Sequence, residues 1–342
     1  MKNRSDTRKR LLVISLIGFL VMSCPGCDRQ EKQREKTKAV TIEQIKIAVP
    51  SSPPASPLFV AFKKGYFKEE GLDVTLLLQT SGKASLQAVI KGEADMAAVG
   101  EAPVMFAGLN DEKIYTIASY MSSTQNYVIV ARKDRGIATP GDLSGKKIGV
   151  TPGTNSEFFM DALFMYNNIN RQDVTVLNFK PPQMFEALME GTVDAVSTWN
   201  PHVIKLQKGL ADKQITFDGD GLYTGRFNLS AGQQFIAENP GVASKVLRAL
   251  LRAVQTIHDN PDESLDTVSE YIKTDRAMVK DIWAIYDFEV TLSQSFIISL
   301  EDEARWAIRK GLTSRQDVPN YLDYIYMQAL EEVKPGAVTI IR

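Results

Sequence analysis

The sequence predicts a fold of two similar α/β lobes joined by a two-strand hinge. An internal duplication indicates this, because the segment that begins at position 46 returns in outline about a hundred residues later. In both copies, short β-branched runs alternate with stretches of helical periodicity. Each copy is therefore a βαβαβ unit in which the first strand lies between the other two.

Three pairs of segments define the duplication. They are KIAVP at 46–50 with KIGVT at 147–151, DVTL at 73–76 with DVTV at 173–176, and Ala88, Gly92 and Asp95 with Ala187, Gly191 and Asp194. In each copy the glycine is a helix C-cap, after which the chain re-enters a strand. We therefore interpret the Gly-x-x-Asp units as structural, and we expect them to place the residues that follow at the mouth of a cleft.

The expected elements follow from these repeats. Strands are expected at 45–49, 74–78, 96–99, 147–151, 174–178 and 195–198, and amphipathic helices at 86–91 and 185–190. Two extended apolar runs, 127–131 and 227–231, are the expected crossings between lobes. Ligands bind such folds beyond the carboxyl ends of the strands, so two facing lobes form a cleft.

The lobes have expected boundaries. Residues 44–128 and 229–342 are assigned to lobe 1, and residues 129–228 to lobe 2. Helical periodicity continues after the second crossing at 240–258, 261–272, 277–285 and 299–310. We expect these C-terminal helices to pack on lobe 1 and to support it rather than bind a ligand.

The N-terminus has the pattern of an export signal. A basic stretch is followed by the apolar run 11–22, which is shorter than the ~20 residues that span a bilayer. The sequence VMSC then resembles a bacterial lipobox, which predicts a signal peptide over 1–23, lipidation of Cys24 and a polar tether over 24–43. Cys27 is the rival acceptor, and ordinary cleavage that releases a soluble protein is the alternative. The expected location is outside the cytoplasmic membrane, held there by lipid.

Composition excludes several classes of function. The 342 residues are 44% hydrophobic and 24% charged, which suits a globular protein of two domains. The net charge of -1 provides no field that would recruit nucleic acid. Both cysteines lie in the leader, so the folded body has no thiol for catalysis, metal ligation or a disulfide.

Helix N-termini supply the first candidate anion site. A terminus carries roughly half a positive charge and free N–H groups, and it binds small anions. In lobe 2 the candidates precede a helix expected over 157–166: Gly153, Thr154, Asn155 and Ser156. Gly153 would let the backbone approach the ligand. A plain helix cap without a ligand is the alternative.

Lobe 1 offers the matching positions. Ser81 and Gly82 precede a helix expected over 84–91, and Ser51 follows the first strand. Lys83 could pair with a carboxylate or sulfonate, or it could remain in solvent.

The ends of the third strands supply further candidates. They are Gly100, Glu101 and Ala102 in lobe 1, and Trp199 and Asn200 in lobe 2. The Trp199 ring could cover an organic part of the ligand, or it could belong to the core. A carboxylate at Glu101 opposes an anion unless it points away or contacts an ammonium group on the ligand.

Three candidates flank the crossings: Asn126, Tyr223 and Arg226. A guanidinium at Arg226 fits sulfonate or carboxylate geometry, although the residue could equally be an ordinary surface arginine.

Four segments occur in a characteristic order: FKKGYFKEEGL at 62–72, GEAD at 92–95 leading to GEAP at 100–103, DLSGKKIGV at 142–150, and GTVDA at 191–195 leading to WNP at 199–201. With these segments the sequence resembles the periplasmic binding proteins of the nitrate, sulfonate and taurine importers, together with the thiamin-precursor binders. The resemblance covers 44–330.

The resemblance implies a type II periplasmic binding protein fold. It also implies that the protein delivers a small-molecule anion or zwitterion to an ABC permease and its ATPase, without catalysis. We expect a monomer with no cofactor, no metal and no nucleic-acid partner.

Two other classes of function remain open. Related pyrimidine synthases of thiamin biosynthesis are enzymes, and their resemblance implies an active-site histidine and a cysteine-rich iron motif. This chain has only His202 and His258, and no cysteine outside the leader. A sensory module would use the same cleft, and ligand identity stays open among nitrate, sulfonates, taurine, aromatic carboxylates and a pyrimidine precursor.

Overall fold

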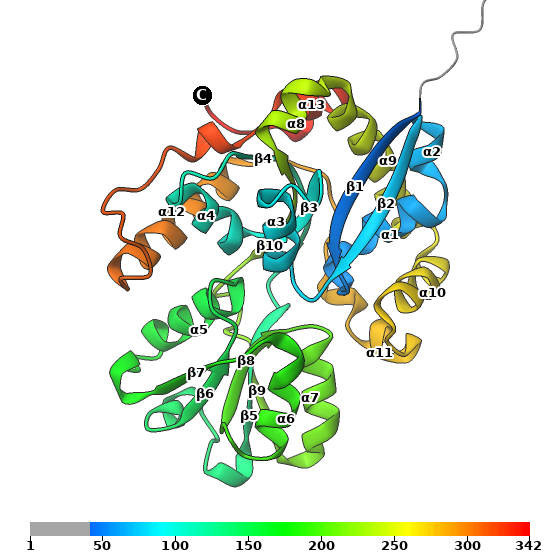
Figure 1. Ribbon diagram of the computed structural model, residues 1–342. Coiled ribbons are helices and arrows are strands. Elements are labelled where there is room, and N and C mark those ends of the chain that lie inside the picture. The colour runs from blue at the N-terminus through cyan, green and yellow to red at the C-terminus, as the bar shows by residue number, and fades with distance from the viewer. Residues whose placement is uncertain (1–41) are drawn as a thin grey trace, which may run out of the picture. The chain divides into compact units, whose positions relative to one another are not determined.

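The computed structural model describes residues 42–342 as two mixed β-sheets with helices packed on them (Figure 1). The predicted signal peptide, Cys24, Cys27 and nearly all of the predicted tether lie outside the described residues. The tether prediction extends to position 43, whereas strand β1 already begins at Glu43 and pairs along its whole length with β2.

The first sheet belongs to lobe 1. Its strand order is β2 (Leu72–Gln79), β1 (Glu43–Pro50), β3 (Met96–Gly100), β10 (Gly225–Gly232) and β4 (Ile114–Ser123). The first three strands are parallel, whereas β10 runs antiparallel to both β3 and β4.

The second sheet repeats this arrangement in lobe 2. Its order is β7 (Thr175–Asn178), β6 (Lys147–Val150), β8 (Ala195–Trp199), β5 (Tyr127–Arg132) and β9 (Gln214–Phe217). In both sheets the first strand of the duplicated unit lies between the other two, and an antiparallel strand follows. The prediction of two similar α/β lobes is confirmed.

The duplicated aspartates have the same structural role in both lobes. The Asp95 carboxylate accepts the backbone N–H of Lys46 at 2.7 Å, and Asp194 accepts that of Lys147 at 2.9 Å. Each aspartate therefore fixes the start of the third strand beside the first strand of its lobe, as the structural interpretation of the Gly-x-x-Asp units expected.

Helices cover both sheets (Figure 1). Lobe 1 carries α1 (Ser56–Lys63), α2 (Tyr66–Glu69), α3 (Gly82–Ile90) and α4 (Glu101–Leu109), and lobe 2 carries α5 (Asn155–Tyr166), α6 (Met184–Met189) and α7 (His202–Leu210). The C-terminal region adds α8 (Gln233–Glu238), α9 (Pro240–Asp259), α10 (Pro261–Ile272), α11 (Arg276–Asp281), α12 (Gln294–Arg309) and α13 (Gln328–Val333). Helix α9 packs on α1, and α12 packs on α4.

The crossings between lobes differ from the prediction. The runs 127–131 and 227–231 are ordinary sheet strands, because β5 pairs with β8 and β9 while β10 pairs with β3 and β4. The chain instead passes between the sheets at 124–126 and 218–224. The lobe boundaries shift accordingly by a few residues, and the hinge consists of two short connections that precede the predicted strands.

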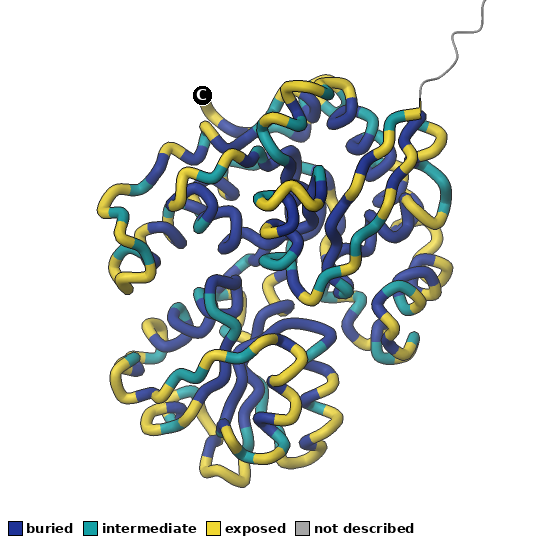
Figure 2. The backbone as a smooth tube through the Cα atoms, viewed as in Figure 1, coloured by how far each residue is buried: buried dark blue, intermediate teal, exposed yellow. Residues whose placement is uncertain are grey.

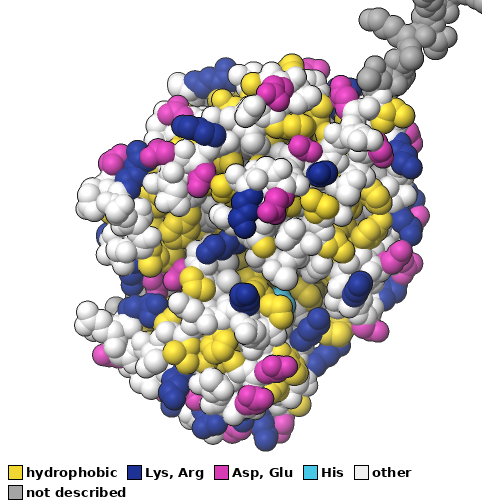
Figure 3. All heavy atoms as spheres, in the orientation of Figure 1, with side chains coloured by type: hydrophobic (Ala, Val, Ile, Leu, Met, Phe, Trp, Pro, Cys, Tyr) yellow, Lys and Arg dark blue, Asp and Glu magenta, His cyan; other side chains and the backbone are white. Residues whose placement is uncertain are grey.

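Burial follows the sheets. The central strands of both sheets are buried, whereas strands β2, β7 and β9 at the sheet edges are only partly buried (Figure 2). On the face seen in Figure 3, positive and negative side chains are interspersed, which agrees with a net charge near zero. Within residues 42–342, no helix combines the length and apolar character needed to cross a bilayer.

Candidate ligand-binding site

A small pocket lies between the two lobes. Its lining comes from both lobes: Ser52, Pro54, Ser81, Gly82, Lys83, Gly100, Pro103 and Phe227 from lobe 1, Asn126 from the first connection, and Tyr127, Thr154, Asn155 and Trp199 from lobe 2. Its free volume is about 20 Å³, which is room for about one water molecule. An anion with three oxygens therefore needs the lobes to part slightly. The lining contains no carboxylate and one cation, Lys83.

Helices α3 and α5 begin at this pocket. Ser81 is the N-cap of α3, and its hydroxyl oxygen accepts the N–H of Ala84 at 3.2 Å. Thr154 is the N-cap of α5, but its hydroxyl donates to the Thr151 carbonyl at 2.7 Å instead of capping the helix. The first N–H groups of each helix have no partner inside their helix, so both termini present positive ends to the pocket.

Asn126 contributes a hydrogen-bond donor. Its side chain is 1% exposed, and its Oδ1 accepts the Tyr286 hydroxyl proton at 3.0 Å. Its Nδ2 has no hydrogen-bond partner among residues 42–342. Buried donors are rarely left unpaired, because an unmet hydrogen bond costs about 1–3 kcal/mol. A ligand acceptor in this pocket would satisfy it.

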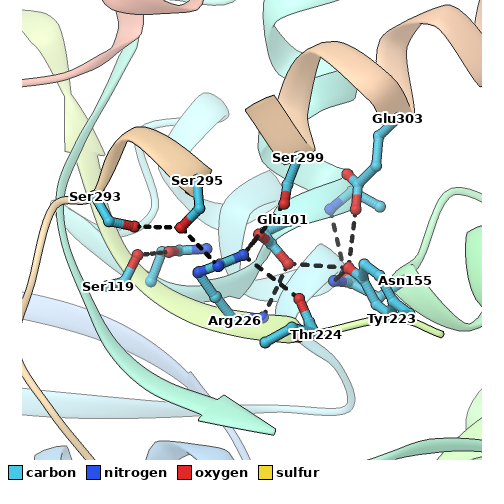
Figure 4. Close-up of polar contacts among 12 residues, drawn as sticks. Glu101, Ser119, Asn155, Tyr223, Thr224, Arg226, Ser293, Ser295, Ser299 and Glu303 are labelled. Carbon is cyan, nitrogen blue, oxygen red and sulfur yellow. Dashed lines mark hydrogen bonds and ion pairs between the residues drawn. The ribbon is translucent and has the colours of Figure 1, made fainter. Parts of the chain in front are cut away.

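The charge conflict at Glu101 is resolved by Arg226. The Glu101 carboxylate is fully buried, and it accepts the Arg226 guanidinium at 3.0 Å and the Arg226 backbone N–H at 2.9 Å (Figure 4). Ser299 and Ser295 on α12 also contact this guanidinium. Neither Glu101 nor Arg226 lines the pocket. Arg226, a sequence candidate for a positive charge near the ligand, is paired with Glu101 in this structure.

Tyr223 links this ion pair to α12. Its hydroxyl lies 3.0 Å from Glu101 Oε2 and 2.9 Å from Glu303 Oε1, and Asn155 Nδ2 donates to it at 2.6 Å (Figure 4). A phenol has one proton, so it can donate to only one carboxylate. Burial, and then the nearby Glu101 charge, raise the pKa of Glu303 well above its usual range. The carboxyl groups of Glu101 and Glu303 therefore compete for the single Tyr223 proton.

The structure brings part of the predicted site together. The predicted residues that line the pocket are Ser81, Gly82, Gly100, Asn126, Thr154, Asn155 and Trp199. Ser51 does not line it, since its neighbour Ser52 takes that place. Ala102 donates its N–H to Asn155 Oδ1 at 3.3 Å, and the Ser156 hydroxyl contacts that of Thr154 at 2.9 Å. Ala102, Ser156, Asn200 and Tyr223 are buried and do not line the pocket.

Sequence reasoning did not identify Pro54, Tyr127 and Phe227 as lining residues. Tyr127 and Phe227 lie in the two runs that were interpreted as crossings between the lobes. Among residues 42–342 there is also no group of three His, Cys, Asp or Glu side chains that could hold a metal ion.

A larger groove adjoins the pocket, with a volume of about 300 Å³. It is lined by Lys83, Leu86, Gln87, Ile90, Pro103, Phe106, Ala107, Asn110, Glu112, Pro152, Gly153, Glu157 and Leu312. The predicted candidate Gly153 lies here. At the boundary, Lys83 Nζ donates to the Pro152 carbonyl at 2.7 Å and so connects the lobes.

Trp199 packs edge-on against His202, with ring centroids 5.8 Å apart. Burial lowers the pKa of His202 to about 4. The unfolded chain binds a proton near pH 6.5, so the free energy of unfolding falls as the pH drops from about 6.5 to about 4. We expect the wild type to lose about 2 kcal/mol between pH 7 and pH 5 relative to His202→Gln. Urea unfolding at both pH values measures this difference. If the wild type and His202→Gln lost the same free energy of unfolding between pH 7 and pH 5, the prediction would be contradicted.

Comparison with known proteins places this geometry in a family. Residues 52–264 match the family described as NMT1/THI5 like. The chain belongs to the NMT1/THI5-like family. A relative in Bacillus subtilis (strain 168), the "Putative aliphatic sulfonates-binding protein", is 24% identical over 96% of this chain and 99% of its own. The "Taurine-binding periplasmic protein" of Escherichia coli (strain K12) is 24% identical over 66% of this chain and 70% of its own.

Solved structures show the same fold. The alkanesulfonate-binding protein SsuA from Xanthomonas axonopodis pv. citri, bound to MOPS, superposes with a TM-score of 0.72 at 18% identity. The match covers 83% of this chain and 98% of that protein, which confirms the periplasmic binding protein fold. A further relative, the "4-amino-5-hydroxymethyl-2-methylpyrimidine phosphate synthase" of Aspergillus parasiticus, is 26% identical over 65% of this chain and 67% of its own.

Proposed function

We propose that this protein is an extracytoplasmic solute-binding lipoprotein of an ABC importer, anchored through Cys24. It captures a small anion of the sulfonate, taurine or nitrate class between its lobes and delivers it to a permease. It does not catalyse a reaction.

The lining of the interlobe pocket carries this proposal. The pocket presents hydrogen-bond donors from two helix N-termini, the unpaired Asn126 amide and the Lys83 ammonium. No carboxylate lines it. Such a lining favours an acceptor-rich anion over a cation. The Glu101 charge is neutralised by Arg226 behind the pocket, so it does not oppose the anion.

The ligand would act by joining the lobes. Contacts to Ser81 in lobe 1 and to Thr154 in lobe 2 would stabilise the closed arrangement, which a permease can distinguish from an open one. The printed names of the sulfonate-binding and taurine-binding relatives support a sulfonate group as the anion.

The pyrimidine phosphate synthase relative favours one second candidate, the binding of a thiamin-precursor pyrimidine. That ligand is a flat heterocycle, and it would use the Trp199 ring rather than the helix N-termini. The two candidates thus predict different ligand classes.

A thermal-shift screen of the purified protein tests the proposal. We expect a sulfonate at 100 times its dissociation constant to add about 2.7 kcal/mol to the free energy of unfolding. Nitrate, bicarbonate, carboxylates, taurine and pyrimidine precursors form the comparison panel. Stabilisation by a pyrimidine alone would support the second candidate, and no stabilisation by any anion would contradict the proposal.

A further inference from the structure

We infer that Asp161 on α5 and Trp306 on α12 form a clasp that holds the two lobes closed before any ligand binds. The clasp lies outside the binding site, because neither residue lines the interlobe pocket or the adjoining groove. Closure of the empty protein does not depend on the proposed function. Only the effect of the clasp on ligand affinity rests on that function.

The two helices of the clasp belong to different lobes. Helix α5 packs on strands β5 and β8 of lobe 2, whereas α12 packs on α4 of lobe 1 (Figure 1). A contact between α5 and α12 therefore joins the lobes, and it is lost when the lobes part.

The Asp161 carboxylate is the lobe 2 part of the clasp. Its side chain is only 5% exposed. Its Oδ2 accepts the Trp306 indole N–H at 2.9 Å and lies 3.3 Å from Lys310 Nζ, both on α12. Its Oδ1 lies 2.8 Å from Nε of Arg171, in its own lobe. Two of these three partners therefore come from the other lobe.

The Trp306 ring is the lobe 1 part of the clasp. The ring is buried, and it packs edge-on against Phe158 of α5, with centroids 5.3 Å apart. It also packs edge-on against Phe106 of α4, with centroids 6.2 Å apart. Edge-to-face aromatic pairs are favourable beyond the area that they bury. The ring and the indole N–H therefore both hold α12 against α5.

The indole hydrogen bond should contribute most to the clasp. Hydrogen bonds to a charged group are stronger than those between neutral groups, and the burial of Asp161 prevents water from replacing this one. The Lys310 side chain is 36% exposed, so water screens its ion pair with Asp161 and that pair contributes less.

The clasp also affects ligand affinity. A ligand that binds only the closed arrangement has an apparent affinity proportional to the closed fraction of the empty protein. Loss of the clasp therefore weakens every ligand by one common factor, which is the ratio of the closed fractions of wild type and variant. A change in a pocket residue would instead affect ligands of different shape unequally.

Asp161→Ala and Trp306→Phe are the clasp variants. Asp161→Ala removes the carboxylate beside Arg171 and Lys310, whose side chains are 31% and 36% exposed and can be hydrated. Trp306→Phe removes the N–H donor and keeps an aromatic ring. The control is Asp302→Ala, which removes an exposed carboxylate of α12 whose ion pair at 2.8 Å lies within that helix.

Distances between two spin labels measure the closed fraction of the empty protein. The labels are attached at Tyr166→Cys on α5 and Gln316→Cys after α12, which are exposed positions in different lobes. Cys24→Ser and Cys27→Ser remove the other thiols of the chain.

Without ligand, the wild type and Asp302→Ala should show one dominant short distance. In Asp161→Ala and Trp306→Phe a longer distance should appear, and the ratio of closed to open protein should fall at least about tenfold. Titration calorimetry with butanesulfonate and nitrate measures the second effect. Both affinities should fall by the same factor, equal to the measured fall in the closed fraction.

The outcomes separate the clasp from the proposed function. An unchanged ratio of closed to open protein in both clasp variants, or a wild type that is already open without ligand, would overturn the inference. Unequal losses of affinity for the two anions would place the effect in the pocket and would also overturn it. If neither anion binds the wild type while the clasp variants open, the proposed function fails and the clasp stands.

Discussion

Arg226→Ala should lower the free energy of unfolding by about 3–5 kcal/mol. The substitution leaves Glu101 fully buried without its cation, beside the second buried carboxyl group of Glu303. The pKa of Glu101 is already raised by burial, and Arg226 opposes that rise. Denaturant unfolding at pH 7 measures the loss.

The pH dependence of this variant has a defined sign. Without Arg226 the pKa of Glu101 rises further above its unfolded value, so the variant is more stable below that pKa and loses stability as the pH increases. The variant should therefore recover part of its loss when the pH falls from 7 to 5.

Two further variants complete this test. Arg305→Ala removes an exposed arginine that pairs with Glu301 at 2.9 Å and Asp302 at 2.8 Å, and it should cost at most about 1 kcal/mol. The double variant Arg226→Met with Glu101→Gln should recover most of the loss, since neither charge remains. A loss below about 1 kcal/mol for Arg226→Ala would contradict the buried ion pair.

Gly100→Ala should weaken ligand binding at least about tenfold, or ~1.4 kcal/mol, with little change in fold stability. A Cβ at Gly100 would overlap Asn155 Oδ1 and approach Asn155 Cγ to 3.1 Å. Since Gly100 lies in lobe 1 and Asn155 in lobe 2, the added methyl group keeps the lobes apart. Titration calorimetry with butanesulfonate and denaturant unfolding measure the two effects.

Gly241→Ala is the matched control, because nothing lies within 4 Å of its Cβ position. A double-mutant cycle with Asn155→Ala then identifies the cause. If the overlap is responsible, Gly100→Ala has no further effect once the Asn155 side chain is absent. Undiminished affinity of Gly100→Ala would show that the contact is irrelevant to binding.

The duplicated pattern was sufficient to predict the sheets. The spacing of Gly92 and Asp95 recurs at Gly191 and Asp194, and the repeat made it visible in the sequence, although each aspartate accepts an N–H that lies 49 or 47 positions earlier in the chain. Helix caps are local, which is why Ser81 was correctly placed at a helix start.

The buried network could not be predicted because its members are distant in sequence. Arg226 and Glu101 are 125 positions apart, and only the pairing of β10 with β3 brings them together. The C-terminal helices were expected only to support lobe 1, yet α12 supplies Glu303 to the network. The sequence did indicate that Glu303 is buried, because Glu303 lies on the same helix face as the apolar Leu300 and Ala307.

The crossings were misplaced for a related reason. An extended apolar run at 127–131 has the same pattern whether it joins two lobes or fills the centre of one sheet. The run 127–131 is a strand of the lobe 2 sheet because it pairs with β8 and β9. Pairing with distant strands cannot be predicted from the residues of the run alone.

A crystal structure of the protein with butanesulfonate tests the central claim most directly. The account predicts the sulfonate group between the N-termini of α3 and α5, with an oxygen bonded to Asn126 Nδ2. Butanesulfonate bound at any other surface, with the pocket between Ser81 and Thr154 unchanged, would contradict it.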